Sequence, residues 1–319
     1  MRVLSGVQPT GKLHIGNYFG AIRQYVHLQE EHEGYYFMAN YHALTTVHDG
    51  ALLRQQTLDV AADFLALGLD PAKAVIFRQS DIPEVTELTW ILSTLCPMGL
   101  LQRCHAYKDK VSQGLPAEHG LFAYPVLMAA DILIYNSNLV PVGQDQKQHI
   151  EVTQDLGQRF NHIYGETLTI PEPYILENTA IVPGLDGRKM SKSYDNTIGI
   201  FDPDKVVKKK IMGIVTDSTP VEDPKDPEDN TIFQLYSLFA TPEQKAEMEQ
   251  SFRAGGVGYG EYKKQLLAAF MGYFGNQRAR RTELESDPGY VEDVLAEGAK
   301  KARVVARETL DRVRTAVGF

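Results

Sequence analysis

Two short segments of the sequence combine residue types that are suited to binding a polyphosphate. The first runs from Gln8 to Asn17, reads QPTGKLHIGN, and joins a short apolar run to a stretch of helical periodicity. Gly11 and Gly16 permit close backbone approach to an anion, and the N–H groups that begin a helix attract negative charge. His14 and Asn17 add hydrogen-bonding side chains. The segment therefore predicts a phosphate-binding loop, with an ordinary strand–helix turn as the alternative.

The second segment is a polar loop that contains glycines on its N-terminal side. It reads KMSKS over Lys189–Ser193, so that two lysines stand three positions apart. Lysine is a point charge on a flexible stem, and a mobile loop that carries two of them can close over phosphates. A solvated surface turn is the alternative for this segment when it is considered alone.

The composition is that of an acidic globular protein. The chain has 319 residues, of which 32 are Lys or Arg and 41 are Asp or Glu, a formal net charge of −9, and 43 % are hydrophobic. This length indicates one large domain and a smaller one. The acidic charge disfavours a protein that coats nucleic acid non-specifically.

Cys96 and Cys104 are too few and too loosely spaced for a zinc or iron–sulfur site. We see no signal segment and no long apolar run, which predicts a cytoplasmic protein without a membrane span.

Hydrophobic periodicity predicts the elements that position the two segments. Short apolar runs alternate with stretches of helical period, which indicates a parallel sheet covered by helices on both faces. The expected strands are 2–7, 35–39, 74–78 and 139–142, and the expected helices are 17–31, 51–67, 84–95, 121–135 and 145–160. Ligands bind beyond the carboxyl ends of such strands, which is where segment 8–17 begins.

After about residue 201 only helical periodicity remains. The expected helices are 203–214, 232–238, 242–252, 259–274 and 290–317. The predicted fold class is therefore α/β, a Rossmann-like parallel sheet with flanking helices plus an all-helical C-terminal domain. We expect a catalytic domain at 1–200 that includes the Lys/Ser loop at 184–195. A helical domain at 201–290 and a C-terminal helix at 291–319, packed back toward the catalytic domain, would follow.

Considered together, the two segments resemble the paired signature motifs of the class I aminoacyl-tRNA synthetases. Lys189–Ser193 matches the second motif in full, and His14–Asn17 matches the first, with Asn17 in place of a histidine found in many members. Three further blocks resemble the bacterial-type tryptophanyl-tRNA synthetase family. They are GVQPTG at 6–11 with NYFGA at 17–21, YPVLMAADIL at 124–133, and VPVGQDQKQHIE at 140–151. The resemblance extends over nearly the whole chain.

The resemblance implies a two-step reaction. ATP would activate L-tryptophan to tryptophanyl-adenylate with release of pyrophosphate, and tryptophan would then pass to the terminal adenosine of tRNA(Trp). Neither step needs an enzyme nucleophile, so catalysis would depend on positioning and on stabilising charge. Mg²⁺ would arrive with ATP. The same resemblance implies a homodimer whose helical domain binds the tRNA anticodon.

The resemblance also implies which residues form the ATP site. The expected catalytic residues are Lys189, Lys192, Lys110, Gln8 and Asn17. The expected ATP contacts are Gln8, Pro9, Thr10, Gly16, Asn17, Gly143, Gln144, Asp145, Val182, Lys189, Met190, Ser191, Lys192 and Ser193.

The expected tryptophan pocket surrounds segment 124–133. An indole needs a flat apolar slot and one acceptor for its N–H. Asp131 stands among apolar neighbours, where a carboxylate requires a hydrogen-bond donor, and a ligand N–H can supply one. The expected pocket residues are Asp131, Met128, Tyr124, His42, Val140, Val142, Gln146 and Leu4, the last standing where the family often has phenylalanine. The alternatives are a buried salt bridge for Asp131, a satisfied structural histidine for His42, and core packing for Met128 and the valines.

Basic residues late in the chain could contact RNA phosphates. They are Arg278, Arg280, Arg281, Lys300, Lys301, Arg303, Arg307, Arg312 and Arg314, and a solvated face with acidic partners is the alternative. Three other functions compete with the main prediction. These are a tyrosyl-tRNA synthetase, a small-molecule adenylyltransferase, and a catalytically silent paralogue that binds tRNA or another partner.

Overall fold

The structure, a computed structural model, describes residues 1–104, 118–143, 147–175 and 182–319. The chain forms two compact units, and each contains pieces distant in sequence. The first unit contains Met1–Gly11, Tyr25–Glu177 and Asp287–Phe319, and the second contains Lys12–Gln24 and Asn178–Ser286. These bounds differ from the expected domains at 1–200, 201–290 and 291–319. A short N-terminal piece belongs to the second unit, and the C-terminal helix belongs to the first.

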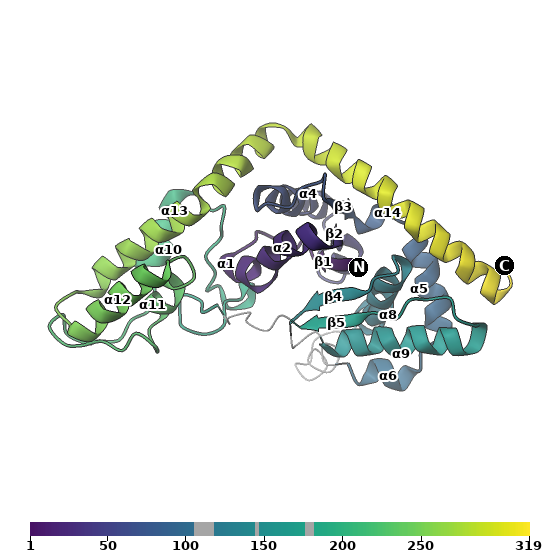
Figure 1. Ribbon diagram of the computed structural model, residues 1–319, viewed down its shortest axis with the longest axis horizontal. Helices are drawn as coiled ribbons and strands as arrows, with labels where there is room; N and C mark the ends of the chain where they lie inside the picture. Colours follow the sequence, from purple (N-terminus) through teal and green to yellow (C-terminus); the bar gives the residue numbers. More distant parts are fainter. Residues whose placement is uncertain (105–117, 144–146, 176–181) are drawn as a thin grey trace. The chain divides into compact units, whose positions relative to one another are not determined.

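The first unit is built on a five-stranded parallel sheet, as expected for the predicted α/β class (Figure 1). Its strand order is β3-β2-β1-β4-β5. The strands are β1 (Arg2–Val7), β2 (Glu33–Met38), β3 (Ala74–Arg78), β4 (Leu139–Val142) and β5 (Glu172–Ile175). The strand order reverses direction beside β1, so segment 8–17 leaves the sheet at a topological switch point, where open α/β sheets bind ligands.

Helices and one 3₁₀ turn connect these strands, and one further helix follows them in the sequence. They are α2 (Arg23–Glu31), α3 (Asn40–Ala43), α4 (Gly50–Ala66), the 3₁₀ turn η2 (Gln79–Asp81), α5 (Glu84–Leu95), α6 (Met98–Gln102), α8 (His119–Ile134), α9 (Lys147–Tyr164) and α14 (Pro288–Val317). Local chemistry accounts for their ends. Asp49 caps α4 by accepting the backbone N–H groups of Ala51 and Leu52, and Gly68 follows that helix with a φ of 112°. Such side-chain caps and left-handed glycines are the usual terminators of helices.

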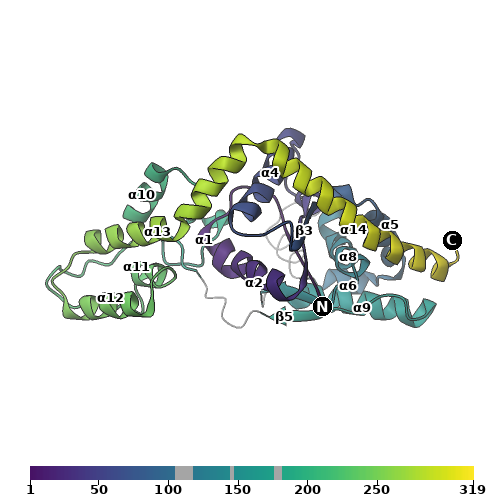
Figure 2. The ribbon, with the colours of Figure 1, turned by 45° about the horizontal axis from the view of Figure 1, so that its top comes forward.

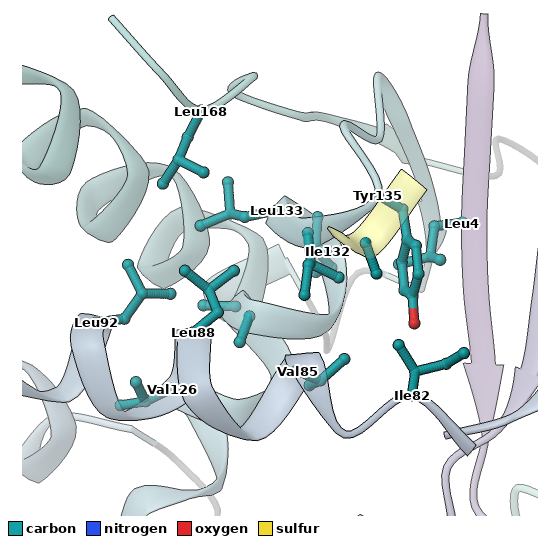
Figure 3. Close-up of a cluster of buried hydrophobic side chains, with 14 of the residues drawn as sticks. Leu4, Ile82, Val85, Leu88, Leu92, Val126, Ile132, Leu133, Tyr135 and Leu168 are labelled. Carbon is teal, nitrogen blue, oxygen red and sulfur yellow. The ribbon is translucent and has the colours of Figure 1, made fainter. Parts of the chain in front are cut away.

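One face of the sheet forms the main core. Leu4, Tyr35, Phe37, Val75 and Phe77 alternate along β1, β2 and β3, and they pack against buried residues of α5, α8, α9 and α14. Figure 3 shows Leu4 of β1 next to the ring of Tyr135, which follows α8. The opposite face carries Tyr36, whose ring stacks on Tyr25 of α2 at 5.0 Å between centroids. Both faces are covered, as the near-continuous apolar strands predict.

The C-terminal helix α14 packs on the edge strand β3 and on α5 within the first unit (Figure 2). Its backbone comes so close to β3 that a Cβ on Gly298 would lie 1.8 Å from the carbonyl oxygen of Ile76. Because any side chain there would clash, glycine is required for this approach. The helix thereby covers a strand edge that would otherwise be exposed.

The second unit is helical. It contains α1 (Ile15–Asn17), the π-helical turn η1 (Tyr18–Ile22), the 3₁₀ turn η4 (Lys192–Tyr194), α10 (Asp204–Met212), α11 (Thr231–Tyr236), α12 (Pro242–Ala254) and α13 (Tyr259–Ser286). The ring of Tyr18 packs edge-on against Phe274 of α13 at 5.2 Å, and Phe19 packs against Phe239 at 5.5 Å. This aromatic cluster fixes η1, and with it α1, on the helices of the same unit. Among the helices of the described residues, none is both long and apolar enough to cross a bilayer.

Candidate functional site

The HIGN segment forms the start of a helix in the second unit. His14 is extended, α1 begins at Ile15, and the backbone N–H of His14 donates to Oδ1 of Asn17 at 3.0 Å. Asn17 therefore closes the first turn with its own side chain. The following residues form the π-helical turn η1, an irregularity that occurs often at functional sites.

Backbone pairing attaches this segment to a stretch that follows the KMSKS motif. Ile15 N–H donates to the carbonyl of Ile198 at 3.1 Å, and Ile200 N–H donates to the carbonyl of Leu13 at 3.2 Å. His14 and Gly199 form an antiparallel bridge between them. The ladder joins positions almost 190 residues apart, so the first motif and the region after the second form one substructure.

The two motifs also touch directly. A Cβ on Gly16 would lie 2.9 Å from Nδ1 of His14 and 3.5 Å from Cβ of Met190. Met190 is buried, and its N–H donates to the carbonyl of Val182 at 2.9 Å. The second unit thus brings together Gly16, Asn17 and the KMSKS loop, which were predicted to act on the same phosphates.

Asn196 holds the KMSKS loop in shape. Its Oδ1 accepts the N–H of Ser191 at 2.8 Å, and its Nδ2 donates to Oδ1 of Asp186 at 2.7 Å and to the carbonyl of Lys189 at 3.2 Å. Gly184 leaves room for this amide, because a Cβ there would lie 2.2 Å from Nδ2. Lys189 and Lys192 are exposed on the loop that Asn196 braces. The sequence analysis did not identify Asn196, although an Asn shortly after a polar loop is a typical turn-forming residue.

Positive charge surrounds His14. Burial, together with repulsion by Lys192 and Lys210, lowers the pKa of this imidazole to about 4. His14 is therefore neutral near pH 7, and its buried Nδ1 has no hydrogen-bond partner among the described residues. Asp202 accepts from Lys12 at 3.2 Å and from Lys210 at 3.0 Å, and although burial opposes this, the two lysines lower the pKa of Asp202. One carboxylate among three lysines leaves an environment that attracts anions.

The first unit contains a separate polar cluster around Asp131 of α8. Asp131 is 2 % exposed, and its Oδ2 lies 2.9 Å from Nε2 of His42. Nε2 of Gln79 lies 2.9 Å from Oδ1 and 2.8 Å from Oδ2. Burial raises the pKa of Asp131, and the hydrogen bonds from His42 and Gln79 oppose that shift. The protein itself thus supplies donors to the carboxylate, which requires them in an apolar environment.

Tyr124, about two turns before Asp131 on α8, extends this cluster. Its ring lies edge-on to His42 at 6.1 Å between centroids, and its hydroxyl lies 2.5 Å from Nε2 of His149 on α9. Burial raises the pKa of Tyr124 to about 12, so its hydroxyl keeps its proton at neutral pH. Three of the predicted pocket residues, Asp131, His42 and Tyr124, therefore gather at one place.

Comparison with known proteins identifies the family. The sequence model of the tRNA synthetases class I (W and Y) matches residues 1–275. The chain belongs to this family. It is therefore an aminoacyl-tRNA synthetase with the class I catalytic fold.

Individual relatives match this class I synthetase over its full length. The tryptophan--tRNA ligase of Rhodopirellula baltica is 59 % identical over 319 residues, which are 100 % of both chains. That of Fusobacterium nucleatum is 54 % identical and is matched over 98 % of its own length. A crystal structure of tryptophanyl-tRNA synthetase from Campylobacter jejuni complexed with ADP and tryptophan superposes with a TM-score of 0.95. It is 50 % identical, and the match covers 100 % of each chain.

The apolar residues predicted for the pocket lie in the core of the synthetase's first unit. Leu4, Val140 and Val142 are 1 %, 3 % and 4 % exposed, and Met128 is partly buried against the same core. Core packing is the alternative given above for Met128 and the two valines, and the contact of all four residues with a ligand stays a prediction. Gly143 directly follows β4 at the carboxyl end of the sheet.

The remaining predicted ATP residues are placed as follows. Gln8 is exposed and Pro9 is buried just beyond β1, where the N–H of Thr10 donates to the carbonyl of Gln8 at 2.9 Å. Val182 is buried, and Ser191 and Ser193 belong to the KMSKS loop, where Ser191 Oγ accepts the N–H of Ser193 at 3.3 Å. Lys110, Gln144, Asp145 and Gln146 lie outside the described residues.

Most of the basic residues considered for RNA have partners within the synthetase. Arg303 and Arg307 both donate to Glu84, and Arg314 pairs with Glu87. The pairs Arg280–Glu283, Arg281–Glu285 and Lys300–Glu297, and the hydrogen bond from Arg312 to Asn136, complete this set. Arg278 donates to the carbonyls of Ile200 and Asp202. These contacts agree with the alternative of a face supplied with its own partners.

Proposed function

We propose that the chain is a tryptophan--tRNA ligase that activates L-tryptophan with ATP and transfers it to tRNA(Trp). The observation that carries the proposal is the buried Asp131 cluster, in which His42 and Gln79 make three of the roughly four hydrogen bonds that a carboxylate accepts. The similarity to tryptophan--tRNA ligases at 54–59 % identity over the full chain supports it. The class I fold and the adjacent HIGN and KMSKS motifs support the activation of the amino acid by ATP.

In the first step the tryptophan carboxylate attacks the α-phosphate of ATP, and pyrophosphate leaves. The bond that forms is carboxylate oxygen to α-phosphorus, and the bond that breaks joins this phosphorus to the bridging oxygen of pyrophosphate. Lys189 and Lys192 neutralise the charge that develops on the leaving pyrophosphate, together with Asn17, Gln8 and Lys110. Fixed donors of this kind stabilise a transition state more than a ground state. The exposed lysines on a braced loop suit that role.

Several ATP contacts come from backbone and small side chains. Gly16 admits close approach at the first motif, and Pro9 and Thr10 follow β1. Met190, Ser191 and Ser193 belong to the loop, while Val182, Gly143, Gln144 and Asp145 border adenine and ribose. Mg²⁺ is part of the substrate, because it is bound mainly by the phosphates of ATP.

Tryptophan binds with its indole N–H directed to Asp131. His42 and Tyr124 line the polar end of the pocket, Gln146 holds the amino group, and Met128, Val140, Val142 and Leu4 form the apolar walls. A site whose buried acceptor is satisfied by the ligand rejects analogues that lack the donor by roughly 10⁴–10⁵-fold. Phenylalanine lacks a side-chain donor and is excluded on this ground.

In the second step a hydroxyl of the terminal adenosine of tRNA(Trp) attacks the activated carboxyl carbon, and AMP leaves. The helical segment 201–290 binds the anticodon. Both substrates of this step belong to the cytoplasm, which is where we place the enzyme.

The enzyme acts as a homodimer. Trp90, the single tryptophan of the chain, is 72 % exposed on α5, and Met98 is 63 % exposed at the start of α6. Large exposed apolar residues on neighbouring elements are typical of an interface. Sedimentation of the wild type as a dimer, and of Trp90→Ala as a shifted equilibrium toward monomer, would support this assignment. A monomeric wild type at micromolar concentration would contradict it.

The test of the activation step is exchange of labelled pyrophosphate into ATP with tryptophan, tyrosine or phenylalanine in the absence of tRNA. The proposal predicts exchange with tryptophan alone. Exchange with tyrosine would keep the phosphate chemistry and overturn the pocket assignment. An absence of exchange with all three would favour a silent tRNA-binding paralogue.

A further inference from the structure

Gln79 is a buried polar residue that the sequence analysis did not identify. It directly follows β3 as the first residue of η2, and it is 1 % exposed. Its Nε2 reaches both oxygens of Asp131, at 2.9 and 2.8 Å. Since a buried amide needs partners for each of its polar atoms, these contacts give Gln79 a defined task beside the carboxylate.

A backbone hydrogen bond decides the orientation of the Gln79 amide. Oε1 of Gln79 accepts the N–H of Tyr41 at 2.9 Å. An N–H can bond only to the oxygen side of an amide, so the NH₂ side must face Asp131. Gln79 is therefore a donor to Asp131, and Asp131 is held as an acceptor.

Two further hydrogen bonds join α3 and η2, the elements that carry His42 and Gln79. Nδ2 of Asn40 donates to Oγ of Ser80 at 2.8 Å, and the N–H of Ser80 donates to Oδ1 of Asn40 at 3.0 Å. This reciprocal pair ties α3 to η2, which places His42 and Gln79 side by side against Asp131. Contacts from a rigid base of this kind define the direction in which a ligand can approach.

The clamp, by which we mean His42 and Gln79 hydrogen-bonded to the Asp131 carboxylate, leaves one acceptor position on that carboxylate. Gln79 contacts Oδ1 and Oδ2 of Asp131, and His42 contacts Oδ2. A carboxylate accepts about four hydrogen bonds, two on each oxygen. Among the residues that the structure describes, Oδ2 therefore has two donors and Oδ1 has one, which leaves one acceptor position on Oδ1.

We propose that Gln79 is a positioning residue for amino-acid specificity, which holds Asp131 as an acceptor-only group whose open position on Oδ1 selects a ligand with an N–H donor. The inference deepens the proposed function and rests on it, because the donor is then the indole N–H of tryptophan. Gln79 itself need not touch the substrate, since it acts through the orientation and ionisation of Asp131.

Ionisation of Asp131 depends on this clamp. Burial raises the pKa of Asp131, and the hydrogen bond from Gln79 is one of the influences that lower it. The other titratable groups that face Asp131 are His42 and Tyr41 on α3 and Tyr135 after α8. They are the same in the wild type and in a Gln79 variant, so a difference in pH dependence reports on the clamp.

The first test compares Gln79→Met with Gln55→Met. Both variants replace glutamine by an unbranched apolar side chain of similar size, but Gln55 is exposed on α4. Pyrophosphate exchange is measured with tryptophan and with 3-benzothienylalanine, in which sulfur replaces the indole N–H. We expect Gln79→Met to raise KM for tryptophan by ~10–100-fold, the usual effect of losing hydrogen bonds to a charged group, with little change in kcat. Its preference for tryptophan over the analogue should fall by a similar factor, and Gln55→Met should match the wild type.

The second test uses the pH dependence of KM in a variant of equal length. Gln79→Glu can donate to Asp131 only while the pair keeps a shared proton, so its KM for tryptophan should rise as pH increases. Gln79→Met should show the opposite slope, with KM rising as pH falls, because Asp131 then becomes protonated more readily. Variants that only destabilised the fold would not show these two opposite dependences of KM on pH.

The outcomes separate this inference from the function on which it rests. Absence of tryptophan-dependent exchange in the wild type would overturn the proposed function and this role with it. Normal wild-type exchange combined with unchanged KM, unchanged discrimination and parallel pH profiles in both Gln79 variants would overturn the positioning role alone. Opposite pH slopes together with lost discrimination against the sulfur analogue would establish it.

Discussion

At the scale of the residue, Lys189 and Lys192 are the exposed charges of the KMSKS loop. We expect Lys189→Ala and Lys192→Ala each to slow pyrophosphate exchange by about 10²–10³-fold, since one preorganised contact to developing charge contributes on the order of 3 kcal/mol. KM for tryptophan should change little, because the contacts proposed for these lysines are with the phosphates of ATP. Lys208→Ala, an exposed lysine on α10 of the same unit, is the matched control. A large loss of tryptophan affinity at a normal rate would contradict the assignment.

His14 gives a prediction about pH. Its pKa of about 4 in the fold lies below the ordinary value of 6.5, so the folded protein disfavours the protonated imidazole. The stability that neutral His14 permits is present above pH 6.5 and is lost as pH falls toward 4. Between pH 7 and pH 4.5 the wild type should lose about 2–3 kcal/mol more unfolding free energy than His14→Gln. Denaturant titrations of both proteins at the two pH values measure this, and equal losses would show that His14 is not held neutral.

The sequence predicts some site residues and not others for a physical reason. Asp131 and His42 stand out because a carboxylate or an imidazole in an apolar stretch requires an explanation from local chemistry. Gln79 and Asn196 are ordinary polar residues at the ends of elements. Their importance comes from partners distant in space, such as the contact between Gln79 and Asp131 across 52 positions. Local patterns carry no information about such partners.

At the scale of the element, Asn196 is the brace of the KMSKS loop. We expect Asn196→Ala to lower kcat for pyrophosphate exchange and to raise KM for ATP, together reducing kcat/KM by at least ~10-fold, because the loop loses three hydrogen bonds and with them its fixed geometry.

A control variant separates this effect from general destabilisation. Asn230 caps α11 in the same unit by accepting the N–H groups of Ile232 and Phe233. Asn230→Ala should cost about 1 kcal/mol of stability without changing KM for ATP. If the two variants were equally active at equal stability, the bracing role of Asn196 would be wrong.

Element prediction succeeds where periodicity is strong. The first four strands and most helices lie within a few residues of their expected positions, because one face of each is apolar. Strand β5 was missed, since Glu172–Ile175 contains Pro173 and no alternation. Helix α13 continues to Ser286 beyond the expected end at 274, and its added turns have few apolar residues. Ion pairs such as Arg281–Glu285 support those turns instead.

At the scale of the whole molecule, both units are assembled from distant pieces of chain. Backbone ladders such as Ile15 to Ile198 determine which pieces belong together, and a sequence contains no local signal for them. This is why the expected domains were continuous, whereas Lys12–Gln24 and α14 belong to units formed mainly by other parts of the chain.

The close packing of α14 on β3 can be tested by adding one methyl group at Gly298. Gly298→Ala would place a Cβ 1.8 Å from the carbonyl oxygen of Ile76, so we expect it to lower the unfolding free energy by about 1–3 kcal/mol or more. Gly120→Ala in α8 of the same unit is the control, because its Cβ would meet only Thr45 at 4.0 Å, and we expect it to be neutral or stabilising. Denaturant unfolding measures both. Equal stability of the two variants would mean that α14 does not pack so tightly on β3.

The central claim is that this class I synthetase attaches tryptophan to tRNA. The most direct measurement is charging of unfractionated bacterial tRNA with labelled tryptophan in the presence of MgATP, followed by identification of the acylated tRNA. The account predicts acylation of tRNA(Trp) alone, and no charging with labelled tyrosine. Charging of a tyrosine tRNA, or adenylate formation without any transfer to tRNA, would contradict it.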